Sequence, residues 1–339
     1  MLENSFTGIL LKIYFGFCFI IDIFSFVLYI LILFFIGNRI IKKDKFYFNG
    51  FYKLIFFNGF LDLIFIVKEY IIFRIPQYGF FENFYINIFP ELPICRIFST
   101  SSLAQVIFAT MSGITITFNR YIAIKYPTKY NYIWSGWRLI LLCTWPLLIS
   151  VPVFVIFFEK KMGYRFNQHG GLVLYYKDLY LNKLILTIVI IIHLTGLCIN
   201  IILNVLLVYT VKKLDIVSKI INNRNREMKL EITMVKFAIV YCTFFAIVVF
   251  TEICILIAAY SGSVNVAEDI LIFCVFIKTG MVFFTPYTLL FLSSDFRRKF
   301  LFFFGFSKLS YIGNKNKILI KSIKTPTNVF KFKVTILKN

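Results

Sequence analysis

An apolar run ends and a basic segment begins within Thr115-Ile116-Thr117-Phe118-Asn119-Arg120-Tyr121-Ile122-Ala123-Ile124-Lys125-Tyr126-Pro127. Arg120 lies at the end of the apolar run, next to the aromatic Tyr121. Pro127 prevents a simple continuation of the helix, because proline lacks a backbone N–H and restricts the residue before it. Cys95 stands 25 residues before Arg120, about 37 Å along a helix, which is enough for one membrane crossing. The pattern predicts the end of a membrane-spanning helix.

The composition of the 339-residue chain is that of an integral membrane protein. Hydrophobic residues make up 60% of it and aromatic residues 20%, and the mean hydropathy is +0.82. A soluble core with a polar surface cannot be built from such a composition. The net charge of +21 would indicate nucleic-acid binding in a soluble protein. Here the basic residues fall in loops between apolar runs, as membrane topology requires, so we expect no nucleic-acid partner.

Seven apolar runs have helical length, and each meets or slightly exceeds the roughly 17–25 residues that span a hydrocarbon core. We predict an all-α bundle of seven membrane-spanning helices at residues 13–37, 50–73, 96–118, 139–158, 184–209, 237–260 and 270–292. The second run is the weakest, because charged residues interrupt it. Lys53 and the pair Lys68 and Glu69 are expected to reach the interface from its ends, which leaves only Asp62 near mid-membrane.

The orientation follows from the distribution of lysine and arginine. Of the 37 basic residues, twenty-six lie on one side of the runs, eight on the other and three within them. The positive-inside rule then places the N-terminus outside the cell and the C-terminus in the cytosol. We predict a short extracellular segment at 1–12, a seven-transmembrane domain at 13–304 that ends in an interfacial helix at 294–304, and a basic, disordered cytosolic tail at 305–339 that contacts membrane lipid.

Two loops are long. The outer loop Glu159–Asn182 contains several glycines and the pair Tyr175-Tyr176, and it is expected to cover an outer vestibule. The inner loop Thr210–Lys236 is expected to hold helical extensions broken at Asn222-Asn223. The seven cysteines are scattered, and only His169 and His193 could supply imidazole, so we predict neither a metal site nor a cofactor.

Polar residues inside the runs are the candidates for a functional site. An unpaired Asp62 would cost several kcal/mol, so we expect it to be protonated, paired or hydrated inside the bundle. Glu252 and Lys278 lie in the outer halves of the sixth and seventh runs. They either neutralise each other or line a pocket for a polar or charged ligand, and the two readings are compatible. Further candidates for ligand contact are Ser102, Gln105 and His193, although the serine could bond to its own helix and the histidine to a neighbouring one.

The spacing of Cys95, Arg120 and Tyr121 resembles the third helix of rhodopsin-like G-protein-coupled receptors, with Asn119 in place of the usual aspartate. The resemblance implies that Arg120 alternates between an acidic partner on the sixth helix and a bound partner protein. Glu227 and Glu231 are the available acids. Without the aspartate, the resting restraint is expected to be weaker or to come from those glutamates. The plainer alternative is that Arg120 only obeys the positive-inside rule.

The same resemblance implies an internal polar or sodium-linked site at Asp62, with a structural hydrogen bond as the alternative. It also bears on two further features of the third run. Amine receptors carry an aspartate eighteen residues before the arginine, where this chain has Ser102, so a biogenic amine is disfavoured. The usual disulfide from the start of this helix to the second outer loop is expected to be absent, because the loop has no cysteine. Cys95 is then free, or it reaches Cys254 or Cys274.

Two segments are similar to nematode serpentine chemoreceptors, most closely the class gamma and class V group. They contain Asn119-Arg120-Tyr121, Pro127, Tyr130 and Ile133-Trp134-Ser135, and Pro286-Tyr287-Thr288 with Ser293-Ser294-Asp295-Phe296-Arg297. The resemblance implies a plasma-membrane receptor, of ciliated sensory neurons, that binds an external small molecule and signals through a heterotrimeric G protein. The coupling surface would include Arg120, the loop 124–134 and Arg297.

Two other classes of protein remain as alternatives. A transporter or channel could use Asp22, Asp62, Glu252 and Lys278 as a polar path, but broken helices and paired repeats, which would favour it, are not visible in the sequence. A membrane enzyme would need clustered histidine and acidic ligands, so we predict that the chain is not an enzyme.

Overall fold

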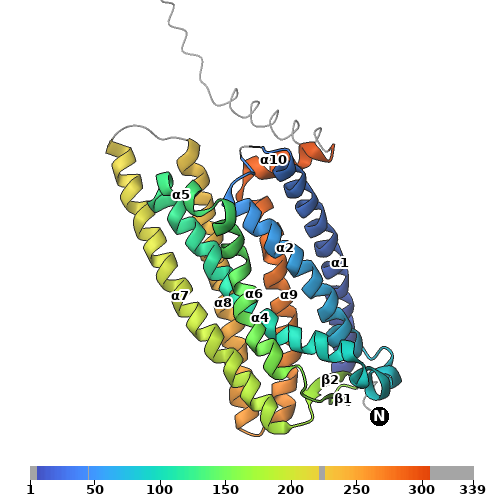
Figure 1. The fold of residues 1–339 in the computed structure, drawn as a ribbon. Coiled ribbons are helices and arrows are strands. Elements are labelled where there is room, and N and C mark those ends of the chain that lie inside the picture. Colours follow the sequence, from blue (N-terminus) through green and yellow to red (C-terminus); the bar gives the residue numbers. More distant parts are fainter. Residues whose placement is uncertain (1–5, 45, 221–225, 306–339) are drawn as a thin grey trace, which may run out of the picture. The chain divides into compact units, whose positions relative to one another are not determined.

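The computed structural model describes residues 6–44, 46–220 and 226–305. Within these ranges seven helices are long and apolar enough to cross a membrane, which confirms the predicted all-α bundle of seven transmembrane helices (Figure 1). They are α1 (Phe6–Ile41), α2 (Gly50–Glu69), α4 (Pro93–Lys125), α6 (Gly136–Phe157), α7 (Leu179–Ile220), α8 (Arg226–Tyr260) and α9 (Val264–Leu292). The orientation in the membrane stays a prediction.

Most of these helices are longer than the predicted spans. Hydropathy marks only the part of a helix that suits hydrocarbon, whereas the hydrogen-bonded backbone continues into polar sequence. α7 and α8 extend into the predicted inner loop, although Asn222-Asn223 lies outside the described ranges. α4 ends at Lys125, and Pro127 opens a separate short helix, α5 (Pro127–Ile133), as the missing N–H of proline requires.

The second span differs most from the prediction. α2 passes without a break into a π-helix, η1 (Tyr70–Arg74), and then into α3 (Ile75–Gln77). Lys68 and Glu69 therefore lie two turns inside the span, and the side chain of Lys68 is only 4% exposed. The expectation that they reach the interface is wrong, because Lys68 bonds to Gln105 of α4 instead of water, and Glu69 lines a cavity inside the bundle.

α4 is the central helix of the bundle. Its polar groups bond to four neighbouring helices through the pairs Asn58–Ser112 (α2, 2.5 Å), Trp145–Thr115 (α6, 3.0 Å), Thr117–Asn200 (α7, 3.0 Å) and Tyr241–Ala109 carbonyl (α8, 3.3 Å). In a membrane such interhelical hydrogen bonds and close packing hold helices together, because lipid is as apolar as the helix surfaces. α4 is thus fixed from four directions.

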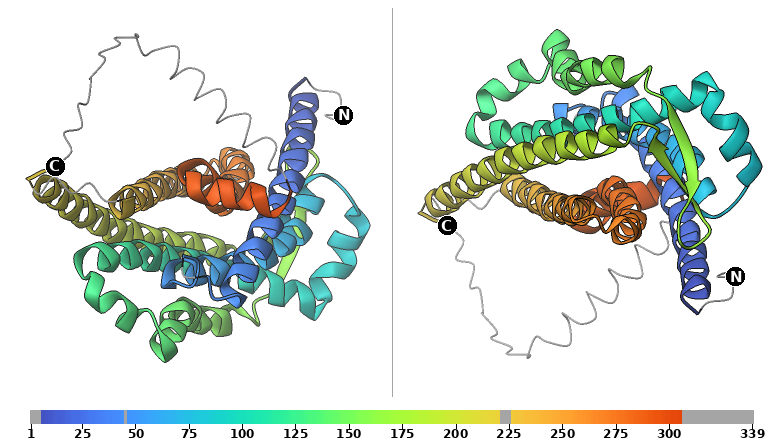
Figure 2. Two further views of the ribbon diagram at one scale, coloured as in Figure 1. Left: turned by 90° about the horizontal axis from the view of Figure 1, so that it is seen from above. Right: turned by 90° about the horizontal axis from the view of Figure 1, so that it is seen from below.

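A β-hairpin lies at one end of the bundle, and we call this end the hairpin end. Its strands β1 (Met162–Phe166) and β2 (Leu172–Tyr176) are antiparallel, with Phe166 opposite Leu172. The turn needs glycine twice: Gly170 has a φ of 80°, and a Cβ on Gly171 would lie 2.5 Å from the Gln77 carbonyl oxygen. The right-hand view of Figure 2 shows the strands lying across part of this end. The sequence predicts a covering loop here but no strands.

The segment after α9 forms α10 (Ser294–Phe303), a second compact unit. Phe296 stacks on Phe300, and Phe300 contacts Phe304, with ring centroids 6.2 Å and 5.0 Å apart. One side of this helix is therefore aromatic. The predicted tail lies outside the described residues from 306 onward.

Close packing of α4 against α7 gives a test of the fold. A Cβ on Gly196 of α7 would lie 2.1 Å from the Thr110 methyl of α4. We expect Gly196→Ala to lower the free energy of unfolding by about 1–3 kcal/mol, the usual cost of overpacking. Thermal unfolding of the purified protein in lipid nanodiscs measures it. Gly280→Ala is the matched control, since a Cβ there meets nothing within 4 Å, and it should be neutral or slightly stabilising. Equal Tm values for the two variants would contradict the packing.

Candidate ligand-binding cavity and coupling end

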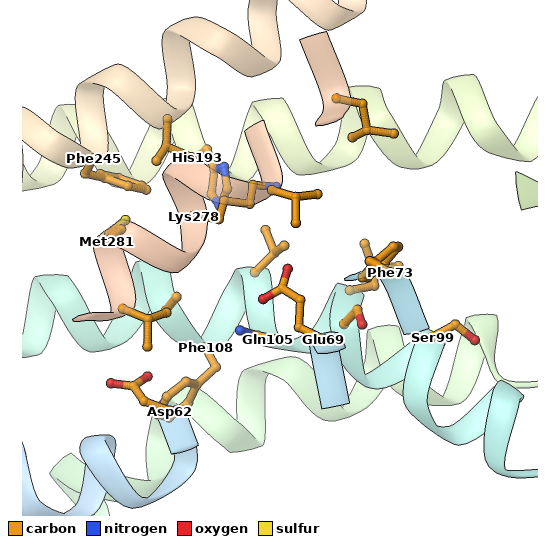
Figure 3. Close-up of a pocket in the computed structure, with 18 of the residues that line it drawn as sticks. Asp62, Glu69, Phe73, Ser99, Gln105, Phe108, His193, Phe245, Lys278 and Met281 are labelled. Carbon is orange, nitrogen blue, oxygen red and sulfur yellow. The ribbon is translucent and has the colours of Figure 1, made fainter. Parts of the chain in front are cut away.

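A cavity of about 310 Å³ lies inside the bundle, between α2, α4, α7, α8, α9 and β2. Figure 3 shows it from within. Of the residues predicted to contact a ligand or form a polar site, five line it: Asp62, Ser102, Gln105, His193 and Lys278. Glu252 lies behind this wall, and its side chain is almost fully buried. The structure thus brings together residues that are up to 216 positions apart in the chain.

An ion pair joins α8 to α9 at the cavity wall. The Oε1 atom of Glu252 lies 2.7 Å from Nζ of Lys278, and its Oε2 atom is hydrogen-bonded to Nδ1 of His193 on α7. Glu252 and Lys278 neutralise each other, and Lys278 also lines the cavity, so the two predicted roles occur together. His193 bonds to Glu252 of the neighbouring helix α8, which was the predicted alternative to ligand contact.

The serines of α4 bond within their own helix. Ser102 donates to the carbonyl of Phe98 at 3.1 Å, and Ser99 donates to that of Cys95. Both also line the cavity. A hydroxyl that donates to its own helix keeps lone pairs that can accept another hydrogen bond.

The inward face of α2 carries two acids, of which only Asp62 was predicted from the sequence to lie inside the bundle. Asp62 accepts a hydrogen bond from the Tyr29 phenol at 2.8 Å, which is the structural bond that was one of its alternatives. Glu69 was expected at the interface but lines the cavity, and its carboxylate extends toward the wall that carries His193 and Lys278 (Figure 3). The spacing of Asp62 and Glu69 could have predicted this position, since residues seven apart lie on one face of a helix.

Two buried cations flank this face. Lys68 donates to Oε1 of Gln105 on α4 at 2.7 Å. Arg74, counted from sequence among the loop residues, is fully buried in η1. Its Nη1 lies 3.5 Å from Asp22 of α1, and its Nη2 donates to Thr279 of α9 at 2.6 Å. The cation therefore ties three helices together.

Aromatic residues fix the hairpin to the π-helix. The phenols of Tyr85 and Tyr164 donate to the carbonyls of Ile71 and Ile72, at 2.7 Å and 2.9 Å. Their rings pack with Cys95 in one buried cluster, and burial raises the pKa of the Tyr164 phenol. All seven cysteines are free thiols, so Cys95 is not bridged to Cys254 or Cys274. Packing around Cys95 takes the place of the loop disulfide.

The other side of the hairpin is held by α9. Arg165 forms an ion pair of 2.5 Å with Glu268, and Asp269 is bonded by His169 and Gln168 at 2.9 Å and 2.7 Å. Residues 172–176 of β2 line the cavity, and burial raises the pKa of the Tyr176 phenol to about 12. The hairpin therefore forms a wall of the cavity at the hairpin end.

The opposite end of the bundle carries the predicted switch residues, and we call it the Arg120 end. Arg120 is buried, with its guanidinium carbon 3.3 Å from the centre of the Phe51 ring on α2. Asn119 donates to the Tyr130 phenol of α5 at 3.2 Å, so it ties the short helix to α4. Tyr121 accepts from Lys125 at 2.5 Å.

Other residues predicted for coupling are described only in part. Pro127 is the first residue of α5, and Arg297 belongs to α10. Glu227 and Glu231 fall within α8, but their side chains lie outside what the structure describes. Among the side chains that it does describe, no group of three His, Cys, Asp or Glu could hold a metal ion.

The sequence matches the family model for Srg family chemoreceptors over residues 15–300. The chain belongs to the Srg family. No curated protein matches the chain. Membership confirms the predicted nematode serpentine chemoreceptor and identifies a multi-pass membrane protein related to G-protein-coupled receptors. The finer assignment to class gamma or class V stays a prediction.

The ion pair of this Srg chain gives a second test. Lys278→Met leaves the Glu252 carboxylate buried without its cation, so we expect it to lower the free energy of unfolding by about 3–5 kcal/mol. The double variant Glu252→Gln, Lys278→Met removes both charges and should recover most of that loss. Thermal unfolding in nanodiscs measures the cycle, and the exposed Lys161→Met is the control. The single variant Glu252→Gln completes the cycle. If the double variant loses as much free energy of unfolding as Lys278→Met and Glu252→Gln lose in sum, the charges are not coupled.

Proposed function

We propose that this chain is a chemosensory receptor that binds an external small molecule in the cavity and activates a heterotrimeric G protein through the Arg120 end. One observation carries the proposal: a chain of a chemoreceptor family encloses a cavity whose wall combines apolar side chains with a few charged and polar groups. Such a wall is typical of small-molecule sites, where apolar surface provides affinity and polar groups fix the orientation.

The arrangement of the cavity supports a role in signalling. A ligand there would contact α2, α4, α7, α8 and α9 at the same time. A small molecule shifts an equilibrium between two helix arrangements only if it binds them with different affinities. A ligand that contacts five helices would bind the two arrangements with different affinities, because a change in helix packing would alter the shape of the cavity. Proposed ligand contacts are Ser102, Gln105, His193 and Lys278, with Glu252 supporting the last two.

The Arg120 end is the proposed site of coupling. Arg120 is held against Phe51 of α2, and Asn119 connects α4 to α5, so motion of α4 would reach both contacts. We propose that G-protein contact involves Asn119, Arg120, Tyr121, Pro127, Glu227, Glu231 and Arg297. The predicted orientation places this end in the cytosol and the hairpin end outside, at the plasma membrane.

The pairing of Asp22, Asp62 and Glu252, the acids of the predicted polar path, supports a receptor over the transporter or channel alternative. Asp22 is paired with Arg74 and Glu252 with Lys278, and Asp62 accepts from Tyr29. An ion path needs groups that exchange partners readily with the passing ion, whereas these acids are fixed to neighbouring helices.

The test is guanine-nucleotide exchange on a panel of G proteins, in membranes that carry the chain, with and without fractions of chemical extracts. We expect a fraction that raises the exchange rate, and we expect Arg120→Ala to return that rate to the level of membranes without the chain. Arg138→Ala is the matched control, since Arg138 is a partly exposed arginine that contacts Tyr132. It should respond like the native chain.

Surface expression of each variant must be measured alongside. A full response from well-expressed Arg120→Ala would contradict the role of Arg120. Silence of the native chain across the whole panel would contradict G-protein activation.

A further inference from the structure

Besides His193, which bonds to Glu252, three acidic or basic side chains line the cavity: Asp62, Glu69 and Lys278. Two of them have partners from the protein, since Tyr29 donates to Asp62 and Glu252 pairs with Lys278. Glu69 has none among the side chains that the structure describes, neither a hydrogen bond nor an ion pair. Its carboxylate extends into the cavity (Figure 3).

The cations near Glu69 interact with its charge from a distance, but their hydrogen bonds and ion pairs are made with other groups. The Lys68 ammonium is bonded to Gln105 and lies 4.9 Å from the centre of the Phe65 ring. Arg74 is bonded to Thr279, pairs with Asp22 and stacks at 3.7 Å on the Phe276 ring. Lys278 is neutralised by Glu252 at 2.7 Å. A carboxylate removed from bulk water is costly unless it is paired and hydrogen-bonded. Glu69 is therefore a carboxylate in the cavity wall that no hydrogen bond or close ion pair from the described residues satisfies.

The surface of the wall is mainly apolar, and the space is small. Apolar side chains lining it include Phe73, Val106, Phe108, Phe245, Val248, Val275 and Met281. The volume of about 310 Å³ is near the lower end of the roughly 300–1,000 Å³ that is usual for small-molecule pockets. A compact and mainly apolar body fits such a wall better than a sugar or a peptide, which would need polar partners over most of its surface.

We propose that the cavity selects a small hydrophobic amine, whose protonated nitrogen binds the Glu69 carboxylate while its apolar body packs toward Phe108 and Phe245. The inference rests on the proposed function, in that the cavity is the ligand site. It places the amine-binding carboxylate on α2. Ser102 stands where amine receptors carry their aspartate, so it disfavours an amine-binding carboxylate on α4 but not on α2. The Lys278 charge does not oppose the ligand, because Glu252 offsets it.

Matched triplets of compounds test the inference. Each triplet keeps one skeleton and changes the head group, as in 2-phenylethylamine, 2-phenylethanol and phenylacetic acid, and the skeletons range in size up to the cavity volume. Binding to the full chain in nanodiscs is measured from the concentration dependence of its thermal unfolding. We expect the amine of at least one triplet to bind best. Glu69→Gln should weaken that amine about 10- to 100-fold, the effect of losing a charge-assisted hydrogen bond.

Two variants serve as controls. Glu91→Gln removes an exposed carboxylate outside the cavity and should leave amine binding unchanged. Glu69→Asp keeps the charge, so it should retain the preference for amine over alcohol with reduced affinity. If Glu69→Gln does not fold, as its unliganded Tm will show, the selectivity of the native chain and of Glu69→Asp decides the question.

The contrary outcomes separate the inference from the function on which it rests. Acids or alcohols that bind more tightly than their amines, or an amine affinity that survives Glu69→Gln, would overturn the amine inference and leave the cavity as the ligand site. If no member of any triplet binds, the cavity is not a site for small molecules, and the proposed function falls together with the inference.

Discussion

The bundle depends on one constraint: a polar side chain within the hydrocarbon core must find its partner inside the protein. α4 meets this constraint with bonds to four neighbouring helices, of which Trp145–Thr115 and Thr117–Asn200 at 3.0 Å are examples. Because lipid offers no alternative partner, each bond specifies which faces of two helices meet. Close contacts at glycines, as between Gly196 and Thr110, then set how near the helices approach.

The same constraint explains why the cavity has its form. Charges near the hairpin end are gathered into pairs that cross between helices, as in Asp22–Arg74 and Glu252–Lys278. These pairs hold α1, α8 and α9 in place around a space that the hairpin helps to line. Glu69 is the exception, and a ligand that completes its pairing would act on the helix that also carries Phe51, the ring beneath Arg120. α2 is thus a direct physical connection between the proposed ligand site and the proposed coupling end.

Much of this could be predicted from the sequence, and the failures have physical causes. Hydropathy located the seven spans because an uninterrupted run of about twenty apolar residues is typical of a membrane-spanning helix. Charged residues are scarce in those spans, so the pairing of Glu252 with Lys278 could be predicted. The positions of Lys68, Glu69 and Arg74 were misjudged, because a π-helix continues the second span past the charges that hydropathy takes as its end. The hairpin was missed because two five-residue strands in a polar loop carry little periodic signal.

The most direct measurement of the central claim is covalent occupancy of the cavity. Ser102→Cys places a thiol on the cavity wall, where the native hydroxyl bonds only to its own helix among the described residues. A membrane-impermeant thiol reagent is added from outside the cell, and nucleotide exchange on the G protein is measured with an active extract fraction, with the native chain treated identically. If the cavity is the ligand site, modification abolishes the response of the variant, and the extract slows modification at the concentrations that activate exchange. A modified variant that responds as fully as the treated native chain would contradict the claim.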